Sequence, residues 1–392
     1  MAPPRSGRKL RVTPPDAPAG DTALIHWREN GAARSARWQS EAGLAPPQRV
    51  RVADDRIKAD AAYRLACEGS ALLWRGDFQN ARALLAAMAR RWDAKPRKRG
   101  ATPADDFHLH RMAQAQRARA LGMLLITFEA DHGIALKRAP DVRLACSEAR
   151  GAGGSRYVAS LRELLGLIGA HEWRKAGVEV EELGARIHPH YGVFSPIRGE
   201  YVTLVARAPL PSGALAFDIG TGTGVLAAVL ARRGVKRVVA TDNDPRALDC
   251  ARENIGRLGF SQRVEVMEAD LFPAGRAPLI VCNPPWLPGK PASPLERAIY
   301  DPDSRMLQAY LAGLGAHLAP EGEGWLILSD LAEHLGLRTR AQLEQWFERA
   351  GLVVIDRLDA KPRHPKASDP NDPLFLARRA EVTSLWRLAV RD

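Results

Sequence analysis

Cysteine is scarce in this sequence of 392 residues, and long apolar runs are missing. Cys67, Cys146, Cys250 and Cys282 are far apart and none forms a C-x-x-C pair, so we expect no disulfide framework and no metal site. No stretch approaches the roughly 20 apolar residues that a membrane span needs. The basic start, residues 1–9, is followed by no apolar segment, so a secretory signal is not expected. These absences favour a reduced, cytoplasmic protein that does not bind membranes.

Positive charge is concentrated in one half of the chain. Residues 188–392 contain 25 Lys and Arg against 24 Asp and Glu, whereas residues 1–187 contain 32 against 21. Nearly all of the formal net charge of +12 therefore lies in the first half. A basic module beside a near-neutral one suggests that the first half binds an acidic partner, with nucleic acid as the leading candidate. A general preference of the genome for arginine is the alternative interpretation.

Composition and periodicity divide the chain into three parts. Residues 1–47 are rich in Pro, Ala, Gly and Arg without sustained periodicity, which predicts a mobile basic tail, with a short ordered piece around Leu24–Trp27 as the alternative. Apolar residues recur at helical spacing in residues 48–187, which predicts an all-α, basic substrate-recognition module. Strand and helix patterns alternate in residues 188–392, which predicts a doubly wound α/β domain.

The expected helices of the second part are a helical hairpin from Asp54 to Trp92, broken at Gly76 and Asp77, and helices at His108–Glu129 and Arg156–Ile168. In the third part we expect seven strands, at 215–218, 238–242, 264–268, 279–283, 324–329, 352–359 and 382–390. Helices are expected at 225–233, 245–258, 304–318 and 339–350.

Three loops contain residues that could bind a ligand. The segment His188–Pro196 is dense in aromatic residues, Gly and Pro, and we expect a packed or cofactor-lining loop in preference to a metal site at its two histidines. The basic segment Lys95–Gly100 favours a solvated connector over a phosphate-contacting loop. The basic segment Lys361–Lys366 follows the sixth predicted strand, so it should lie at the edge of the sheet where ligands bind.

The apolar strand that begins at Ile280 ends abruptly at Asn283, Pro284, Pro285 and Trp286. Because proline cannot donate to a sheet ladder, the strand must stop there and present Asn283 at its carboxyl end, where ligands bind in open parallel sheets. An amide carbonyl, a rigid turn and a flat ring suit a planar amino group. An ordinary strand end with a surface tryptophan is the alternative.

A second candidate site lies upstream, where Asp218 ends a strand and Gly220, Gly222 and Gly224 form a turn before a helix. Glycines at such a turn let a ligand approach the backbone closely. Asp242 ends the next strand, where a carboxylate can accept both hydroxyls of a ribose, and Asp270 follows the third strand, where it can accept from an adenine amino group. Asp242 and Asp270 would also fit a dinucleotide oxidoreductase. Three other features do not fit one: the acid before the turn, the G-x-G-x-G spacing and the Asn-Pro-Pro-Trp end of the strand.

Taken together, Asp218–Gly224, Thr241–Leu248, Asp270 and Asn283–Trp286 resemble the class I S-adenosylmethionine-dependent methyltransferases, whose fold is a Rossmann-like doubly wound sheet of seven strands. Within them the sequence is similar to the amino-methylating branch of the small-domain type, which includes rRNA guanine-amino and release-factor glutamine methyltransferases. The resemblance covers about residues 190–392. The family's fourth position is most often Tyr or Phe, so Trp286 is a mild departure.

The resemblance implies S-adenosylmethionine as the cofactor and a set of residues for each side of the reaction. The cofactor would contact Asp218, Gly220, Thr221, Gly222, Gly224, Asp242, Asn243, Asp270 and Leu271. The acceptor side would consist of Asn283, Pro284, Pro285 and Trp286. Asn283 and the Pro284 carbonyl would hold the amine, and Trp286 would stack on its plane.

The predicted function is transfer of a methyl group to an exocyclic amine of a base in RNA, either rRNA or tRNA. We expect the RNA to be bound by the basic first half and by the basic segment Lys361–Lys366. The first alternative is methylation of a glutamine in a release factor or ribosomal protein. The second alternative, from another class, is a non-catalytic binding protein that keeps the cofactor fold.

Overall fold

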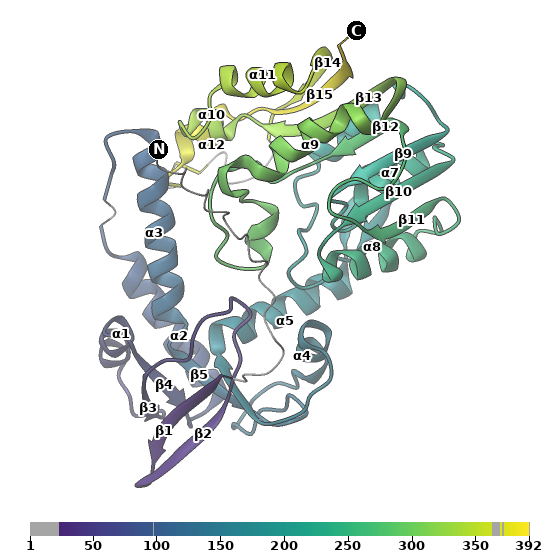
Figure 1. Cartoon of the computed structure of the whole chain (residues 1–392). Helices are drawn as coiled ribbons and strands as arrows, with labels where there is room; N and C mark the ends of the chain where they lie inside the picture. Colours follow the sequence, from purple (N-terminus) through teal and green to yellow (C-terminus); the bar gives the residue numbers. More distant parts are fainter. Residues whose placement is uncertain (1–22, 97, 363–368, 371, 392) are drawn as a thin grey trace, which may run out of the picture.

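The computed structural model describes residues 23–96, 98–362, 369–370 and 372–391 (Figure 1). None of the helices in these ranges is long and apolar enough to cross a membrane. The elements of the first half are β1 (Leu24–Glu29), β2 (Ala32–Trp38), β3 (Arg49–Ala53), α1 (Ala59–Cys67), β4 (Ser70–Trp74), α2 (Phe78–Asp93), α3 (Pro103–Leu121), β5 (Leu124–Phe128), α4 (Arg143–Arg150), β6 (Tyr157–Ser160) and α5 (Leu161–Ala176).

The second half begins with a short antiparallel hairpin and continues as an alternation of strands and helices. Its elements are β7 (Val178–Val180), η1 (Glu181–Leu183), β8 (Ala185–Ile187), α6 (Glu200–Arg207), β9 (Leu215–Ile219), α7 (Val225–Arg232), β10 (Arg237–Asp242), α8 (Pro245–Arg257), β11 (Val264–Glu268), β12 (Ala277–Cys282), η2 (Leu295–Ala298), η3 (Pro302–Ser304), α9 (Arg305–His317), β13 (Leu318–Ser329), α10 (Leu331–His334), α11 (Arg340–Arg349), β14 (Leu352–Ala360), α12 (Phe375–Ala380) and β15 (Thr383–Val390).

The first half is an α/β module, so the prediction of an all-α module was wrong. Six strands form one mixed sheet in the order β1-β2-β6-β5-β4-β3. Strands β1 and β3, at the two ends of this order, also contact each other, so the sheet curls around a small core that includes Ile25, Leu73 and Leu125. The larger core on its other face packs against α1, α2, α4 and α5.

Three strands of this sheet were mistaken for parts of helices. All five residues of β4, all four of β6 and four of the five in β5 are buried, so none of them shows the alternation of a half-exposed strand. A short apolar run buried on both faces cannot be distinguished by period from a turn of buried helix. Glycine was the local signal that these helices end before the strands begin, because Gly69 separates α1 from β4 and Gly122 separates α3 from β5.

The predicted tail, residues 1–47, extends too far along the chain, whereas the ordered piece considered at Leu24–Trp27 is confirmed as part of β1. Residues 24–38 form the hairpin of β1 and β2, and the side chain of Ile25 is completely buried. The remainder of the predicted tail, residues 1–22, lies outside the described residues. The same holds for residues 363–366 of the basic segment Lys361–Lys366.

The second sheet has the predicted seven strands, in the order β11-β10-β9-β12-β13-β15-β14. All neighbours are parallel except β15, which is antiparallel to both β13 and β14. The chain winds outward in one direction from β9 to β11 and then restarts at β12 on the other side of β9. Ligands bind at such a switch point, at the carboxyl ends of the strands.

Alternate residues of these strands enter two cores, one on each face of the sheet. Ala216 and Val281 join α6, α7 and α8 on one face, whereas Phe217 and Ile280 join α9 and α11 on the other. The hairpin of β7 and β8 contributes to the first of these cores through Val180 and Ile187. The core of the second half therefore starts before the predicted boundary at residue 188.

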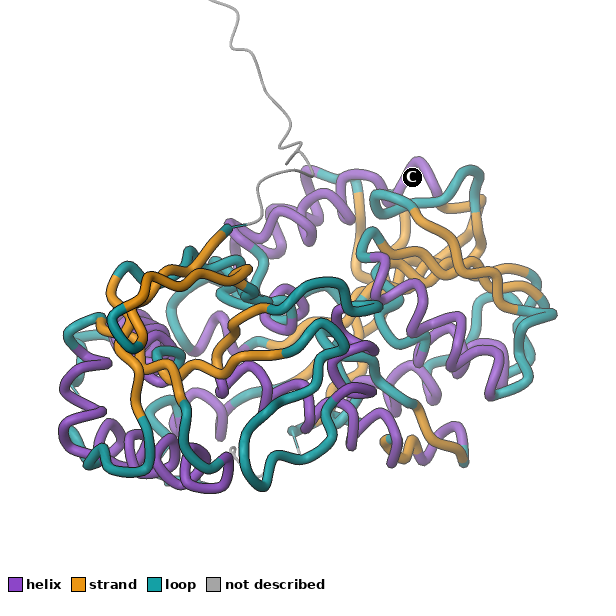
Figure 2. The backbone as a smooth tube through the Cα atoms, turned by 90° about the horizontal axis from the view of Figure 1, so that it is seen from below, coloured by secondary structure: helices purple, strands orange, loops and turns teal. Residues whose placement is uncertain are grey.

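The two sheets form separate groups of strands (Figure 2), and helices and ion pairs connect the halves. Arg174 of α5 pairs with Glu253 of α8 at 2.5 Å, and Arg246 of α8 lies 3.2 Å from Glu41 of the first half. Helix α3 extends from the first sheet toward α10 and α12 (Figure 1). Phe107 of α3 is accordingly buried against residues of the second half.

Candidate active site

A cavity of about 1140 Å3 opens at the carboxyl ends of β9, β10, β11 and β12. It is lined by the glycine turn after β9, by Asp242 and Asn243 after β10, and by Asp270 and Leu271 after β11. The Asn-Pro-Pro-Trp segment after β12 lines the same cavity. Residues that are up to 66 positions apart in the sequence are thus brought to one site by the topology of the sheet.

Asp218 organises the turn from behind and is only 1% exposed. Its Oδ2 atom accepts hydrogen bonds from the Thr221 hydroxyl at 2.6 Å and from the backbone N–H of Ala227 at 3.0 Å. Burial raises the pKa of the Asp218 carboxyl to about 6, and these two hydrogen bonds act in the opposite direction. The carboxylate therefore joins the end of β9 to the first turn of α7.

The three glycines of the turn all have positive φ, but they lie in different surroundings. A Cβ atom on Gly222 would meet nothing within 4 Å, whereas one on Gly224 would lie 3.3 Å from the Cα of Ala251 in α8. Gly220 and Gly222 line the cavity. Gly224 and Asp218, both expected to contact a cofactor, contribute nothing to the cavity wall that the described residues form.

Asp242 faces the turn from the neighbouring strand. Its two carboxylate oxygens accept from the backbone N–H groups of Gly222 and Asp244, each at 3.0 Å. Burial raises the pKa of Asp242, and these backbone hydrogen bonds oppose the rise. Because a carboxylate has about four acceptor positions, the two bonds leave capacity for hydroxyl donors in the cavity.

The amide of Asn283 is fixed by its neighbour Trp286, whose Nε1–H donates to Asn283 Oδ1 at 2.8 Å. Because an indole N–H can only donate, the atom it meets must be the amide oxygen. The indole is held in turn by Arg198, whose guanidinium carbon lies 5.6 Å from the ring centroid. Arg198 forms two hydrogen bonds with Glu381, which is 1% exposed and also accepts from Ser329.

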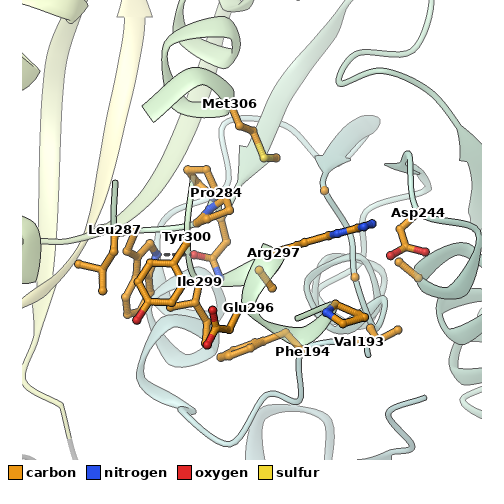
Figure 3. A pocket seen from close by; sticks show the side chains of 18 of the residues that line it. Val193, Phe194, Asp244, Pro284, Leu287, Glu296, Arg297, Ile299, Tyr300 and Met306 are labelled. Atoms are coloured by element: carbon orange, nitrogen blue, oxygen red, sulfur yellow. Dashed lines mark hydrogen bonds between the residues drawn. The ribbon is translucent and has the colours of Figure 1, made fainter. Parts of the chain in front are cut away.

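The segment His188–Pro196 is both packed and cavity-lining, as its composition predicts. The His188 ring lies 2.6 Å from the carbonyl oxygen of Arg174, and the His190 ring lies 2.7 Å from Glu253. Gly192, Val193 and Phe194 then line the cavity, and Figure 3 shows Val193 and Phe194 among the side chains of its wall. The two histidines therefore anchor a loop of the site to α5 and α8.

Several parts of the cavity wall were not predicted, and two of them contact each other. One is residues 287–301, which follow Trp286, and the other is the face of α3 that carries His110, Arg111 and Gln114. The second comes from the first half of the chain. Nothing in the local pattern of α3 signals that its side chains reach a cavity in another module.

Comparison with known proteins places this site in a family. A family model described as methyltransferase small domain matches residues 184–356. A release factor glutamine methyltransferase of Cereibacter sphaeroides is 36% identical over 187 residues, which are 44% of this chain and 66% of that protein. A tRNA1(Val) (adenine(37)-N6)-methyltransferase of Shewanella halifaxensis is 35% identical over 143 residues, which are 34% and 57% of the two chains.

A protein of the same name from Bacteroides fragilis is 33% identical over 179 residues, which are 41% of this chain and 71% of that protein. The chain spans 66% of the length of the Cereibacter relative and 57% of the length of the Shewanella relative. The matched region contains the glycine turn, Asp242, Asp270 and Asn283, and it confirms the resemblance inferred from these residues. The chain belongs to the methyltransferase small domain family, within the class I S-adenosylmethionine-dependent methyltransferases.

Proposed function

We propose that this protein uses S-adenosylmethionine to methylate a planar amino nitrogen, and that the acceptor is an exocyclic amine of a base in RNA. The observation that carries the proposal is the amide oxygen of Asn283. It lies at the carboxyl end of β12, is oriented by an indole N–H, and shares a cavity with the glycine turn.

The residues of the turn fit the cofactor. Gly220 and Gly222 line the cavity and can face its methionyl and adenosyl parts. The space at Gly222 is open, whereas a Cβ atom on Gly220 would lie 2.9 Å from the Cε atom of Met306. Asp242 has acceptor capacity for two ribose hydroxyls, and Asp270, which also lines the cavity, can accept from the adenine amino group. Asp218 and Gly224 support these contacts from behind the turn. When bound, S-adenosylmethionine supplies a methyl group that is already activated by the positive sulfur.

On the acceptor side, the chain needs to orient the amine more than to activate it. The Asn283 oxygen and the Pro284 carbonyl accept the two amine hydrogens, which turns the nitrogen lone pair toward the methyl group. The hydrogen bond from Trp286 occupies one acceptor position of Asn283 and leaves the other for the amine. No general base is required before attack, and the proton leaves to water afterwards.

Charge supports RNA over protein as the acceptor. Arg297 and Arg305 line the cavity and are exposed. Arg305 pairs only loosely with Asp303, at 3.4 Å with both side chains about four-fifths exposed, so it remains available to a phosphate. The first half carries most of the excess positive charge. Relatives named for a tRNA adenine also support this acceptor, and the four free cysteines support the cytoplasm as the location.

The test is transfer of labelled methyl from S-adenosylmethionine into a lysate of a strain that lacks this protein. The purified wild-type protein and Asn283→Ala are compared, and each product is divided between RNase and protease digestion. We expect label that RNase removes and protease does not, and a loss of most of it with Asn283→Ala.

Label that survives RNase but not protease would overturn RNA in favour of a protein glutamine, as named for the Cereibacter relative. Equal labelling by Asn283→Ala would overturn the assignment of the acceptor site itself. Salt gives an independent check, because binding through several phosphates weakens steeply with ionic strength.

A further inference from the structure

The loop that follows Trp286 closes on itself and forms one wall of the cavity. We call residues 287–301 the flap. Its two ends lie side by side, because the N–H of Leu287 donates to the carbonyl oxygen of Ile299 at 3.1 Å and the N–H of Asp301 donates to the carbonyl oxygen of Leu287 at 2.9 Å. Figure 3 shows Glu296, Ile299 and Tyr300 near Leu287 and Pro284, with Arg297 reaching across the cavity in the direction of Asp244. The flap is therefore the wall beside the predicted acceptor position.

Helix α3 holds the flap through Arg111. One guanidinium nitrogen lies 2.9 Å from Oε2 of Glu296, and another donates to the carbonyl oxygen of Lys290 at 2.7 Å. The guanidinium carbon lies 3.8 Å from the ring centroid of Tyr300. Glu296 also accepts from the backbone N–H of Ala292 at 2.8 Å, so the pair with Arg111 fixes the turn of the flap as well as its position.

A second contact on the same face of α3 holds the base of the flap. Phe107 is 2% exposed, packs against Leu287, and has its ring centroid 6.3 Å from that of Tyr300. Because residues four apart lie on one face of a helix, Phe107 and Arg111 contact the flap together. Gln114, almost one turn further along, lines the cavity.

The contacts of Arg111 require a guanidinium group. Its side chain and that of Glu296 are 21% and 29% exposed, so the pair is partly removed from water and its charge-assisted hydrogen bonds are stronger than those of a surface pair. A planar fork can bond to two oxygens while it stacks on a ring, and a lysine ammonium cannot reproduce both. The cofactor residues Gly222 and Asp242 belong to other elements.

We propose that Arg111 is a positioning residue for the acceptor: through it, α3 of the first half fixes the flap, so that the acceptor site is built from both halves of the chain. This inference rests on the proposed function for the identity of the acceptor. It also assigns the first half a part in the site itself, beyond the binding of RNA at a distance. The cofactor end of the cavity should be insensitive to changes at Arg111.

The test uses the full chain with Arg111→Met, Arg111→Lys and Arg117→Met. Arg117 is a matched control on the same helix, because it forms a bidentate pair with Asp93 inside the first half and does not reach the cavity. We expect Arg111→Met to lower kcat/KM for total RNA from a strain lacking the protein by about 10- to 100-fold, the factor for a lost charge-assisted hydrogen bond. Arg111→Lys should restore little of the lost kcat/KM.

Two further measurements separate positioning from folding. The Kd for S-adenosylmethionine should stay within about twofold in every variant. Amide exchange of the flap should accelerate in Arg111→Met and stay unchanged in Arg117→Met. Unchanged exchange in Arg111→Met, or an equal loss of activity in Arg117→Met, would overturn the proposal.

If the wild-type protein transfers no methyl group, the proposed function fails. The exchange experiment needs no acceptor and still decides whether Arg111 holds the flap.

Discussion

Replacing Trp286 with Phe tests how the acceptor amide is held. Phenylalanine keeps an aromatic ring but removes the N–H that donates to Asn283 Oδ1 at 2.8 Å. The amide of Asn283 can then turn over and present its NH2 group, which cannot accept the amine hydrogens. A neutral hydrogen bond contributes about 0.5 to 1.5 kcal/mol, so we expect kcat to fall by about 2- to 13-fold.

The assay is steady-state methyl transfer at saturating S-adenosylmethionine, with kcat and KM for the acceptor measured separately and the cofactor Kd measured by calorimetry. Asn283→Ala removes the acceptor oxygen itself and should lower kcat by about 10²- to 10³-fold, as the loss of one preorganised polar group does elsewhere. The Kd for the cofactor should change little in either variant, because the turn and Asp242 remain intact.

A double-mutant cycle distinguishes hydrogen bonding from stacking. If Trp286 acts through Asn283, then Trp286→Phe should cost nothing further in the Asn283→Ala background, measured as a single-turnover rate. An equal cost in both backgrounds would refute the reasoning and assign the effect to the ring. Thermal unfolding of Trp286→Phe controls for lost packing, because Arg198 lies over the indole.

Three further predictions concern the cofactor side. Gly224→Ala should lower the free energy of unfolding by roughly 1 to 3 kcal/mol more than Gly222→Ala in thermal unfolding, because only Gly224 combines a φ of +80° with a Cβ 3.3 Å from Ala251. Asp242→Ala should raise the Kd for S-adenosylmethionine in calorimetry by about tenfold or more, since a charged acceptor is lost from two hydroxyls. The folded-state pKa of Asp218, about 6, is above its ordinary 3.8, so its stabilising contribution is complete below about pH 4 and is lost as the pH rises through 6. The difference in stability between the wild type and Asp218→Asn should therefore fall across this interval in urea titrations, and a constant difference would contradict it.

The second half of the chain could be predicted because its signals are local. Asp244 and Pro245 predict the start of α8. The Asp244 side chain accepts a hydrogen bond from the N–H of Arg246, and proline is favoured in the first turn of a helix. Asn283 and Pro284 mark the end of β12 in the same way. Once strand and helix alternate, the handedness of the connections leaves few topologies, and the strand ends must meet at one edge.

The first half could not be predicted as well, and α3 shows why. Met112 fits the helical spacing of apolar residues in the predicted helix His108–Glu129, yet Met112 is 51% exposed, whereas Phe107 is buried against the second half. A helix that packs against two modules has no single apolar stripe. Arg111 shows the same difficulty, because a contact between modules leaves no periodic pattern and Arg111 resembles any exposed arginine in the sequence.

The roles of Asp218 and Gly224 could be located from the sequence but not assigned. The motif correctly marks the turn, and the resemblance suggested that every member contacts the cofactor. Only the packing reveals that Gly224 makes room for α8 and that the Asp218 carboxylate bonds to Thr221 and Ala227. The motif therefore includes residues that line the cavity and residues that hold the turn in place, and spacing alone cannot distinguish the two groups.

The acceptor site contains residues inside the region that the family model matches and residues outside it, and this bears on which acceptor the protein selects. This chain is similar both to a relative named for a tRNA adenine and to one named for a release-factor glutamine. The cofactor end and the Asn-Pro-Pro-Trp segment lie inside the matched region, so these features alone cannot distinguish the two acceptors. Helix α3 lies outside residues 184–356 and still reaches the cavity through Arg111 and Gln114, and Arg111 bonds to the flap beside the predicted acceptor position. Selection of the acceptor should therefore depend on this helix and on the flap that it holds, while the methyl donor is bound in the same way whichever acceptor enters.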